Sequence, residues 1–256
     1  MVLKTNADGC RLDPGMRGDF NVSDLGSKSE TGRAALFRLM TWMSPAYPVG
    51  AYTYSQGLEW AVETGAVADG ADLQAWLTEV LRFGSGRSDA ILFRHAHGAA
   101  AGGDLDALIE VAELAAAFQP SAERRLEALA QGKAFAVATL PVFACPMLAA
   151  LAEARGDALS YPVAVSVAAA DQTIALDTAL AAYLHGVVAN LVSAGVRLVP
   201  LGQSAGLKVL TALEPVIAEV AAASAPLTLD DLGGATILAD IASMRHETQY
   251  TRLFRS

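Results

Sequence analysis

The sequence predicts an all-α fold, a single globular bundle of about nine or ten helices. Apolar side chains recur at the three- and four-residue spacing of helices, and no segment alternates as a half-buried strand does. Of the 256 residues, 53% are hydrophobic and only 18% are charged, so the chain can bury a large core. Short segments rich in glycine and proline separate the helical stretches, and no repeat of fixed length is present.

Charge and cysteine content narrow the choice of partners and compartment. The net charge of -9 argues against nucleic acid or an anionic membrane as a partner, because both attract clustered Lys and Arg. Cys10 and Cys145 lie far apart, which argues against a disulfide framework or a zinc ribbon. The N-terminal residues lack the apolar stretch of a signal peptide. We therefore expect a cytoplasmic protein.

The chain divides into a leader and one domain. Residues 1–33 are rich in Gly, Asp and Ser and show no helical periodicity, which predicts a flexible leader. Residues 34–256 are expected to form the all-helical domain, with a docking tail at 245–256.

The helices of the domain can be assigned in order from caps and apolar spacing. The first clear stripe follows a cap at Asp69 or Asp72, and the second follows Asp104. A third helix begins after Ser121 as cap, with Glu123 in its first turn. Its expected buried stripe is Leu126, Leu129, Ala130 and Val137.

The later helices are more apolar. Residues 178–196 contain no Asp, Glu, Lys or Arg and are long enough to span a membrane, but their small residues favour a helix buried on all sides of a soluble core. Two further stripes follow. They consist of Leu207, Leu210, Leu213, Ile217 and Val220, and of Leu232, Leu238 and Ile241.

Motifs that would carry chemistry are incomplete. "PLGQSAGLK" (200–208) lacks the G-x-x-x-x-G-K-[ST] spacing of a phosphate-binding loop. We expect a turn there, with Gly202 in a backbone conformation closed to other residues and Gln203 or Ser204 binding helix-end amides. "HETQY" (246–250) offers a single histidine where a zinc peptidase needs two. No catalytic residue and no metal site is predicted.

Two segments look more specific than packing requires. In "SPAYPVGAYTYSQGLEWAVETG" (44–65), Thr53 and Gln56 fit a capping box, and Glu59 lies near the start of the next helix. "MRHETQYTRLFRS" (244–256) places three arginines among Tyr250, Leu253 and Phe254, a mixture that is enriched at binding hot spots. A well-capped turn and a frayed basic tail are the plainer alternatives.

These two segments, together with "VRLVPLGQSAGLKVLTALEPVI" (196–217), resemble the urease accessory protein F family. The resemblance covers about residue 34 to the C-terminus and is loosest between residues 86 and 157. It implies an all-α homodimer that binds the scaffold accessory protein D or H, recruits the accessory GTPase G and serves nickel insertion into apo-urease. It also implies that the chain binds no cofactor tightly and that the complex handles the nickel.

The resemblance assigns the residues that bind partners or support an interface. They are Pro48, Gly50, Tyr52, Ser55, Glu59, Arg197, Gly202, Gln203, Arg245, His246, Glu247, Tyr250, Arg252, Leu253, Phe254 and Ser256. A nested hypothesis gives Arg245 or Arg252 a role in stimulating the GTPase. A different class of function, a helical enzyme or small-molecule-binding protein with a pocket around Tyr52, Tyr54 and Gln203, remains the alternative.

Overall fold

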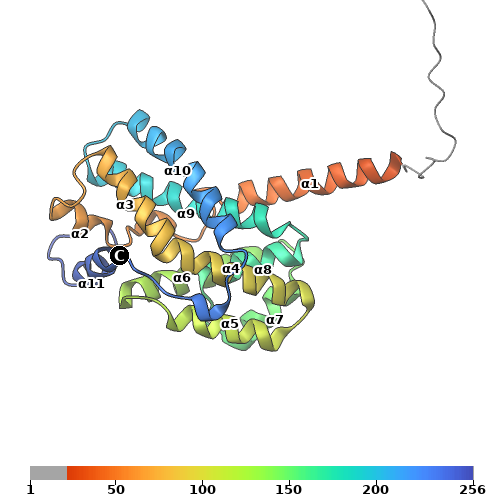
Figure 1. The fold of residues 1–256 in the computed structure, drawn as a ribbon. Helices are drawn as coiled ribbons and strands as arrows, with labels where there is room; N and C mark the ends of the chain where they lie inside the picture. The colour runs from red at the N-terminus through yellow and green to blue at the C-terminus, as the bar shows by residue number, and fades with distance from the viewer. Residues whose placement is uncertain (1–21, 256) are drawn as a thin grey trace, which may run out of the picture.

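The structure confirms the all-α prediction (Figure 1). A computed structural model describes the backbone of residues 22–255 and the side chains of residues 32–255. Every regular element in that part of the chain is a helix. The α-helices are α1 (Val22–Trp42), α2 (Leu58–Glu63), α3 (Gly70–Phe83), α4 (Ser85–Gly102), α5 (Leu105–Ala117), α6 (Ala122–Thr139), α7 (Pro146–Arg155), α8 (Tyr161–Asp171), α9 (Leu176–Leu198), α10 (Gln203–Ala223) and α11 (Ile237–His246), and the short 3-10 helices are η1 (Ala51–Thr53) and η2 (Leu229–Asp231).

Helix α1 projects from the body of the molecule (Figure 1). Its C-terminal end is anchored by the buried side chains of Leu39 and Trp42. The predicted boundary at residue 33 falls inside this helix, so residues 22–33 of the predicted leader are helical. The remainder of the predicted leader, residues 1–21, lies outside the described residues.

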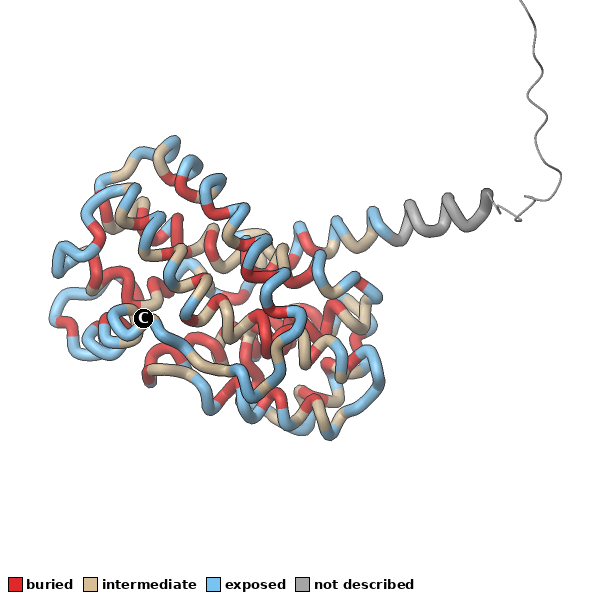
Figure 2. Tube along the Cα trace, viewed as in Figure 1, coloured by how far each residue is buried: buried red, intermediate tan, exposed pale blue. Residues whose placement is uncertain are grey.

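Helix α8, and not α9, is the helix buried on all sides (Figure 2). All residues from Pro162 to Ala169 are buried, and α4, α5, α6, α7 and α9 contact the helix. Its side chains there are mostly Ala and Val, which let neighbouring helices approach closely. The prediction for residues 178–196 was therefore wrong. Within the described residues α9 is the one helix long and apolar enough to cross a membrane, and half of its most apolar window is buried inside the protein.

A chain of aromatic rings links the central helices. Trp42 of α1 lies edge-on to Phe135 of α6, with ring centroids 5.6 Å apart. Phe135 contacts Tyr161 of α8 at 6.0 Å, and Tyr161 contacts Tyr183 of α9 at 5.5 Å. Tyr183 then packs against Phe93 of α4 at 5.4 Å. Such tilted and edge-on contacts add to the stabilisation from apolar burial.

The apolar spacing predicted α3 and α5 well. Asp69 caps α3 by accepting hydrogen bonds from the amides of Ala71 and Asp72, and Asp104 caps α5 through the amide of Ala107. Leu73, Leu77 and Leu81 are buried on one face of α3. In both helices the side-chain cap indicates where the helix starts, and the apolar stripe that follows it indicates which side is buried.

The predicted buried face of α6 was wrong. Leu126 and Val137 are exposed, whereas the buried face contains Glu123, Arg124 and Glu127. Arg124 forms an ion pair with Glu127, so the two charges compensate each other inside the protein. Apolar spacing cannot reveal a buried face whose first half consists mainly of polar residues.

The expectations for the last two helices also need correction. Gly202 has an ordinary φ of -72°, and α10 starts at Gln203 without a side-chain cap. On α11, Leu238 and Ile241 face solvent, and the buried residues are Ala242, Ser243 and His246. The outer face of α11 is therefore apolar and its inner face partly polar, the reverse of the usual arrangement.

Replacing Gly132 by Ala should destabilise the contact between α6 and the start of α8. A Cβ at residue 132 would lie 2.0 Å from the carbonyl oxygen of Leu159, so the helices would have to separate at a cost of about 1–3 kcal/mol. Gly98→Ala is the matched control, because nothing lies within 4 Å of its Cβ position. Urea denaturation measures the free energy of unfolding of both variants. Equal stability of the two variants would contradict the close approach.

Candidate functional site

The loop before α2 takes a shape that requires unusual backbone angles. Gly50, Gln56 and Gly57 have φ values of 75°, 57° and 81°. At Gly57 a Cβ would lie 2.5 Å from the backbone nitrogen of Ser243, so α11 packs directly on this loop. The predicted capping box does not form: Thr53 donates to the carbonyl of Gly50, and the Gln56 amide donates to Glu127.

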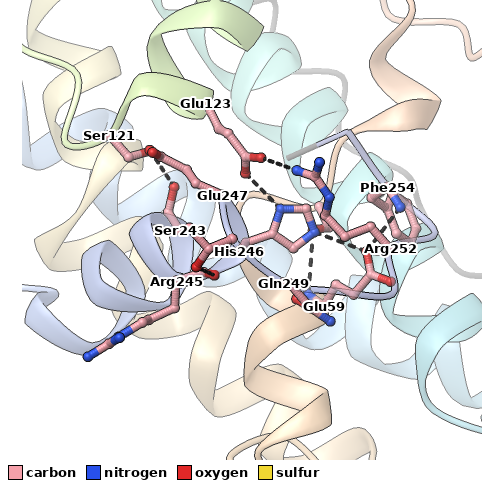
Figure 3. A network of polar contacts seen from close by, with 12 residues as sticks. Glu59, Ser121, Glu123, Ser243, Arg245, His246, Glu247, Gln249, Arg252 and Phe254 are labelled. Atoms are coloured by element: carbon pink, nitrogen blue, oxygen red, sulfur yellow. Dashed lines mark hydrogen bonds and ion pairs between the residues drawn. The ribbon is translucent and has the colours of Figure 1, made fainter.

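His246, the last residue of α11, lies between two carboxylates (Figure 3). Its Nε2 is 3.1 Å from Oε2 of Glu59 in α2, and its Nδ1 is 2.7 Å from Oε2 of Glu123 in α6. The imidazole is 0% exposed. A neutral imidazole has one N–H and one lone pair, so only the doubly protonated ring donates to both carboxylates.

The same two carboxylates also hold the tail. Glu59 accepts hydrogen bonds from the backbone amides of Leu253 at 2.6 Å and Phe254 at 2.9 Å. Arg252 donates from Nη1 to Oε1 of Glu123 at 2.8 Å. Each carboxylate thus accepts several hydrogen bonds from donors in α11 and the tail, which compensates for its burial. We call Glu59, Glu123, His246, Arg252 and Phe254 the tail latch.

Phe254 closes the latch with an apolar contact. Its side chain is buried, and the guanidinium of Arg197 lies over its ring at 4.3 Å. The same guanidinium lies 3.6 Å from the ring of Tyr52 and donates to the Tyr52 carbonyl. The amide of Arg255 donates to the carbonyl of Thr53 at 2.8 Å. The tail therefore covers the loop of residues 50–57, and burial of Phe254 stabilises it by about 1.5–3 kcal/mol.

The start of α6 is bound to α11 as well. Ser121 caps α6 through the amide of Arg124, and its hydroxyl lies 2.5 Å from that of Ser243. Glu247 accepts a hydrogen bond from the amide of Ala122 at 2.9 Å. Because the N-terminal amides of a helix lack intrahelical partners, Glu247 satisfies one of them from outside.

The structure brings together many of the residues that the sequence singled out. Those in the latch or in contact with it are Tyr52, Glu59, Arg197, His246, Glu247, Arg252, Leu253 and Phe254. Ser55 lies beneath them, with its hydroxyl 3.4 Å from the amide of Glu59.

The remaining candidates lie elsewhere. Pro48 and Gly50 are exposed in the loop, Gly202 and Gln203 are exposed at the start of α10, and Arg245 and Tyr250 point to solvent. Ser256 lies outside the described residues. Half of the candidates thus lie in the latch or in contact with it, and the tail contributes backbone amides as well as side chains.

Three contributors to the site were not recognised as such from the sequence: Ser121, Glu123 and Ser243. Ser121 and Glu123 were identified only as features of a helix start. Their second role depends on α11, which lies more than 120 residues further along the chain, and no local spacing encodes such a contact.

The latch is built to hold a segment in place. A general acid or base must lie within hydrogen-bonding reach of the bound substrate. His246 is enclosed, so a substrate could not contact its ring nitrogens. Within the described residues, no group of three or more His, Cys, Asp or Glu side chains could hold a metal ion. What the arrangement can do is order the tail and fix α11.

Replacing His246 by Ala should release the tail. Glu59 and Glu123 would lose the hydrogen-bond partner between them, and leaving a buried polar group unsatisfied costs about 1–3 kcal/mol. Hydrogen exchange at the amides of Leu253 and Phe254 should accelerate strongly. His185→Ala, at an exposed position of α9, should leave exchange unchanged. Continued protection of both amides in His246→Ala would show that the bridge does not hold the tail.

Comparison with known proteins gives a consistent result. Residues 67–214 match the family model described as UreF. The chain is 53% identical over 223 residues to "Urease accessory protein UreF" of Rhodopseudomonas palustris (strain BisB5), an alignment that covers 87% of this chain and 92% of the relative. It is 53% identical over 228 residues to the protein of the same name from Bradyrhizobium sp. (strain BTAi1 / ATCC BAA-1182), covering 89% and 95%. The chain therefore belongs to the UreF family of urease accessory proteins.

Proposed function

We propose that this urease accessory protein acts as an adaptor in the cytoplasm. In this proposal it binds the scaffold accessory protein D or H, recruits or regulates the accessory GTPase G, and so supports GTP-dependent insertion of nickel into apo-urease. Nickel is the cargo of the assembly and is not a resident cofactor of this chain. The observation that carries the proposal is the outward apolar face of α11, held in place by the tail latch.

That face is formed by residues at helical spacing. Ile237, Leu238, Ile241 and Met244 are all exposed, Leu238 to 74%. We call these four residues the α11 face. Tyr250 and Leu253 of the tail are also exposed. Contiguous exposed apolar surface of this kind is uncommon on monomers and marks interaction sites, and an arginine such as Arg245 is frequent at binding hot spots.

The arginines of the tail differ in their availability to a GTPase. Arg252 is engaged by Glu123. Arg245 is exposed, and its side chain has no ion pair with any described residue. If the adaptor acts on the phosphates of the GTPase, Arg245 is therefore the better placed of the two to stabilise developing charge.

The structure does not favour the small-molecule alternative as it was framed. Tyr54 is buried, one face of the Tyr52 ring is occupied by the Arg197 guanidinium, and Gln203 is exposed at the start of α10. None of the three lines the cavity that lies beside the loop, although Ser55 and Gln56 do.

Substitutions on the α11 face should abolish urease maturation while the fold remains. In cells with a urease operon that lacks its own F gene, the wild-type chain should restore urease activity. Leu238→Arg with Ile241→Arg should lose that rescue and co-purification with the scaffold protein, because loss of hot-spot residues costs about 2 kcal/mol or more each.

The matched control is Leu207→Arg, an equally exposed leucine on α10. It should retain both rescue and co-purification. Rescue by the α11 double variant, at equal expression and helical content, would overturn the proposed docking surface. Failure of the wild-type chain to rescue, even together with its own scaffold and GTPase, would overturn the adaptor function.

We also propose that the chain forms a homodimer through α1. Leu36, Phe37 and Met40 lie on one exposed side of the projecting helix, with Phe37 62% exposed. A helix that leaves the body of the molecule with apolar residues exposed lacks the contacts that normally stabilise it. A second copy that supplied the same surface would cover both arms, as a two-fold dimer does.

Phe37→Arg should shift the chain toward monomers. Burial of an arginine in a symmetric contact would place two like charges close together, so we expect at least a tenfold weaker self-association, equivalent to about 1.4 kcal/mol. Sedimentation across a concentration series measures it. Val142→Arg, also at an exposed position, is the control. An unchanged dimer in Phe37→Arg would place the interface elsewhere.

A further inference from the structure

We propose that a cavity between α3, α4, α6 and α11 binds the cationic end of a small alkylguanidinium or alkylammonium compound. The cavity measures about 210 Å³. Its polar wall includes Asp89, Arg124 and Asp240, together with hydroxyl groups of serine and threonine residues. This inference does not rest on the proposed adaptor function, although Ile237 and Leu238 of the α11 face also line the groove beside the cavity.

A groove leads from the cavity to the surface. The groove has a volume of about 230 Å³ and shares Trp76, Val80, Thr236 and Ala239 with the cavity wall. Glu79 also lines the groove and adds negative charge. Because the groove and the cavity share part of their walls, we take the groove between α3 and the start of α11 as the entrance for a ligand.

The charges in the cavity do not balance. Arg124 is matched by Glu127, with which it forms a buried ion pair. Asp89 receives one hydrogen bond, from Tyr183 Oη to its Oδ2 at 2.8 Å. Asp240 has no side-chain hydrogen bond or ion pair with any described residue. Two carboxylates thus line one cavity, and neither forms an ion pair with a described residue.

Both carboxylates are disfavoured as anions by their surroundings. Burial raises the pKa of Asp89 to about 6, although the Tyr183 hydrogen bond and the charge of Arg124 act in the opposite direction and the charge of Glu127 adds to the rise. Burial also raises the pKa of Asp240, again opposed by Arg124. A bound cation that carries N–H groups would supply the missing hydrogen bonds and charge.

The apolar part of the wall selects an organic cation. Trp76, Leu77, Val80, Leu92 and Phe118 line the cavity beside the carboxylates. They offer contacts to an alkyl chain, and the aromatic rings can also attract a cation. A metal ion is a poorer fit, because the described residues contain no group of three or more His, Cys, Asp or Glu side chains able to hold one.

Calorimetric titration of the full chain with butylguanidinium tests the proposal. Saturable binding is expected. Butyramide lacks the charge and tetramethylammonium lacks the N–H donors, so each should bind at least about tenfold more weakly. Binding of butylguanidinium should weaken as the pH falls through about 6, because Asp89 then takes up a proton.

Three variants and one control test whether butylguanidinium binds in this cavity. Asp89→Asn and Asp240→Asn should each reduce affinity at least about tenfold. Ala239→Phe keeps every charge but fills the passage between groove and cavity, so it should also abolish binding. Asp106→Asn, on the exposed surface of α5, should change nothing. If Asp89→Asn does not fold, Asp240→Asn and Ala239→Phe still decide the question.

Absence of saturable binding would overturn the proposal, as would equal affinity in the wild type, Asp240→Asn and Ala239→Phe. The source of the cation is a separate question. Repeating the titration with the chain bound to its scaffold partner distinguishes the two sources. Retained binding indicates a free small molecule, whereas binding by the isolated chain alone indicates that a Lys or Arg side chain of the partner fills the cavity.

Discussion

His246 has no contact with solvent, and the two carboxylates that surround its ring come from α2 and α6, far apart in the sequence. Removing such charges from water is expensive, and only close pairing and complete hydrogen bonding offset the loss. The ring can satisfy both carboxylates from one place only, at the end of α11. The bridge therefore fixes α11 against both helices. The amides of residues 253 and 254 and the side chain of Arg252 donate further hydrogen bonds to the same two carboxylates.

Helix α11 separates three environments. Its inner end carries His246 into the latch, its outward side presents the α11 face, and Asp240 lines the cavity shared with α3, α4 and α6. A ten-residue helix is too short to be stable by itself. Its contacts with α2 and α6 hold it in place, so we expect loss of the latch to loosen the α11 face as well.

The sequence predicted the fold class well, and the helices α3 and α5 in detail, because there a cap and an apolar stripe indicate the same boundaries. It failed at α6 and α11, where the buried face is partly polar and some apolar residues face outward. The tail was recognised as special from its arginines and aromatic residues. That it docks on the chain's own loop could not be predicted, because Glu59 and His246 meet only after the intervening helices have packed.

The measurement that tests the latch most directly is a nitrogen NMR spectrum of the chain with labelled histidine, with the His246 signals assigned by substitution. The geometry predicts that each ring nitrogen of His246 is hydrogen-bonded to one carboxylate, so Glu59→Gln and Glu123→Gln should each shift the signal of the nitrogen that faces the replaced side chain. Unchanged nitrogen signals in both variants, with the tail still docked, would contradict the account, because the bridge could then not be the interaction that orders the tail.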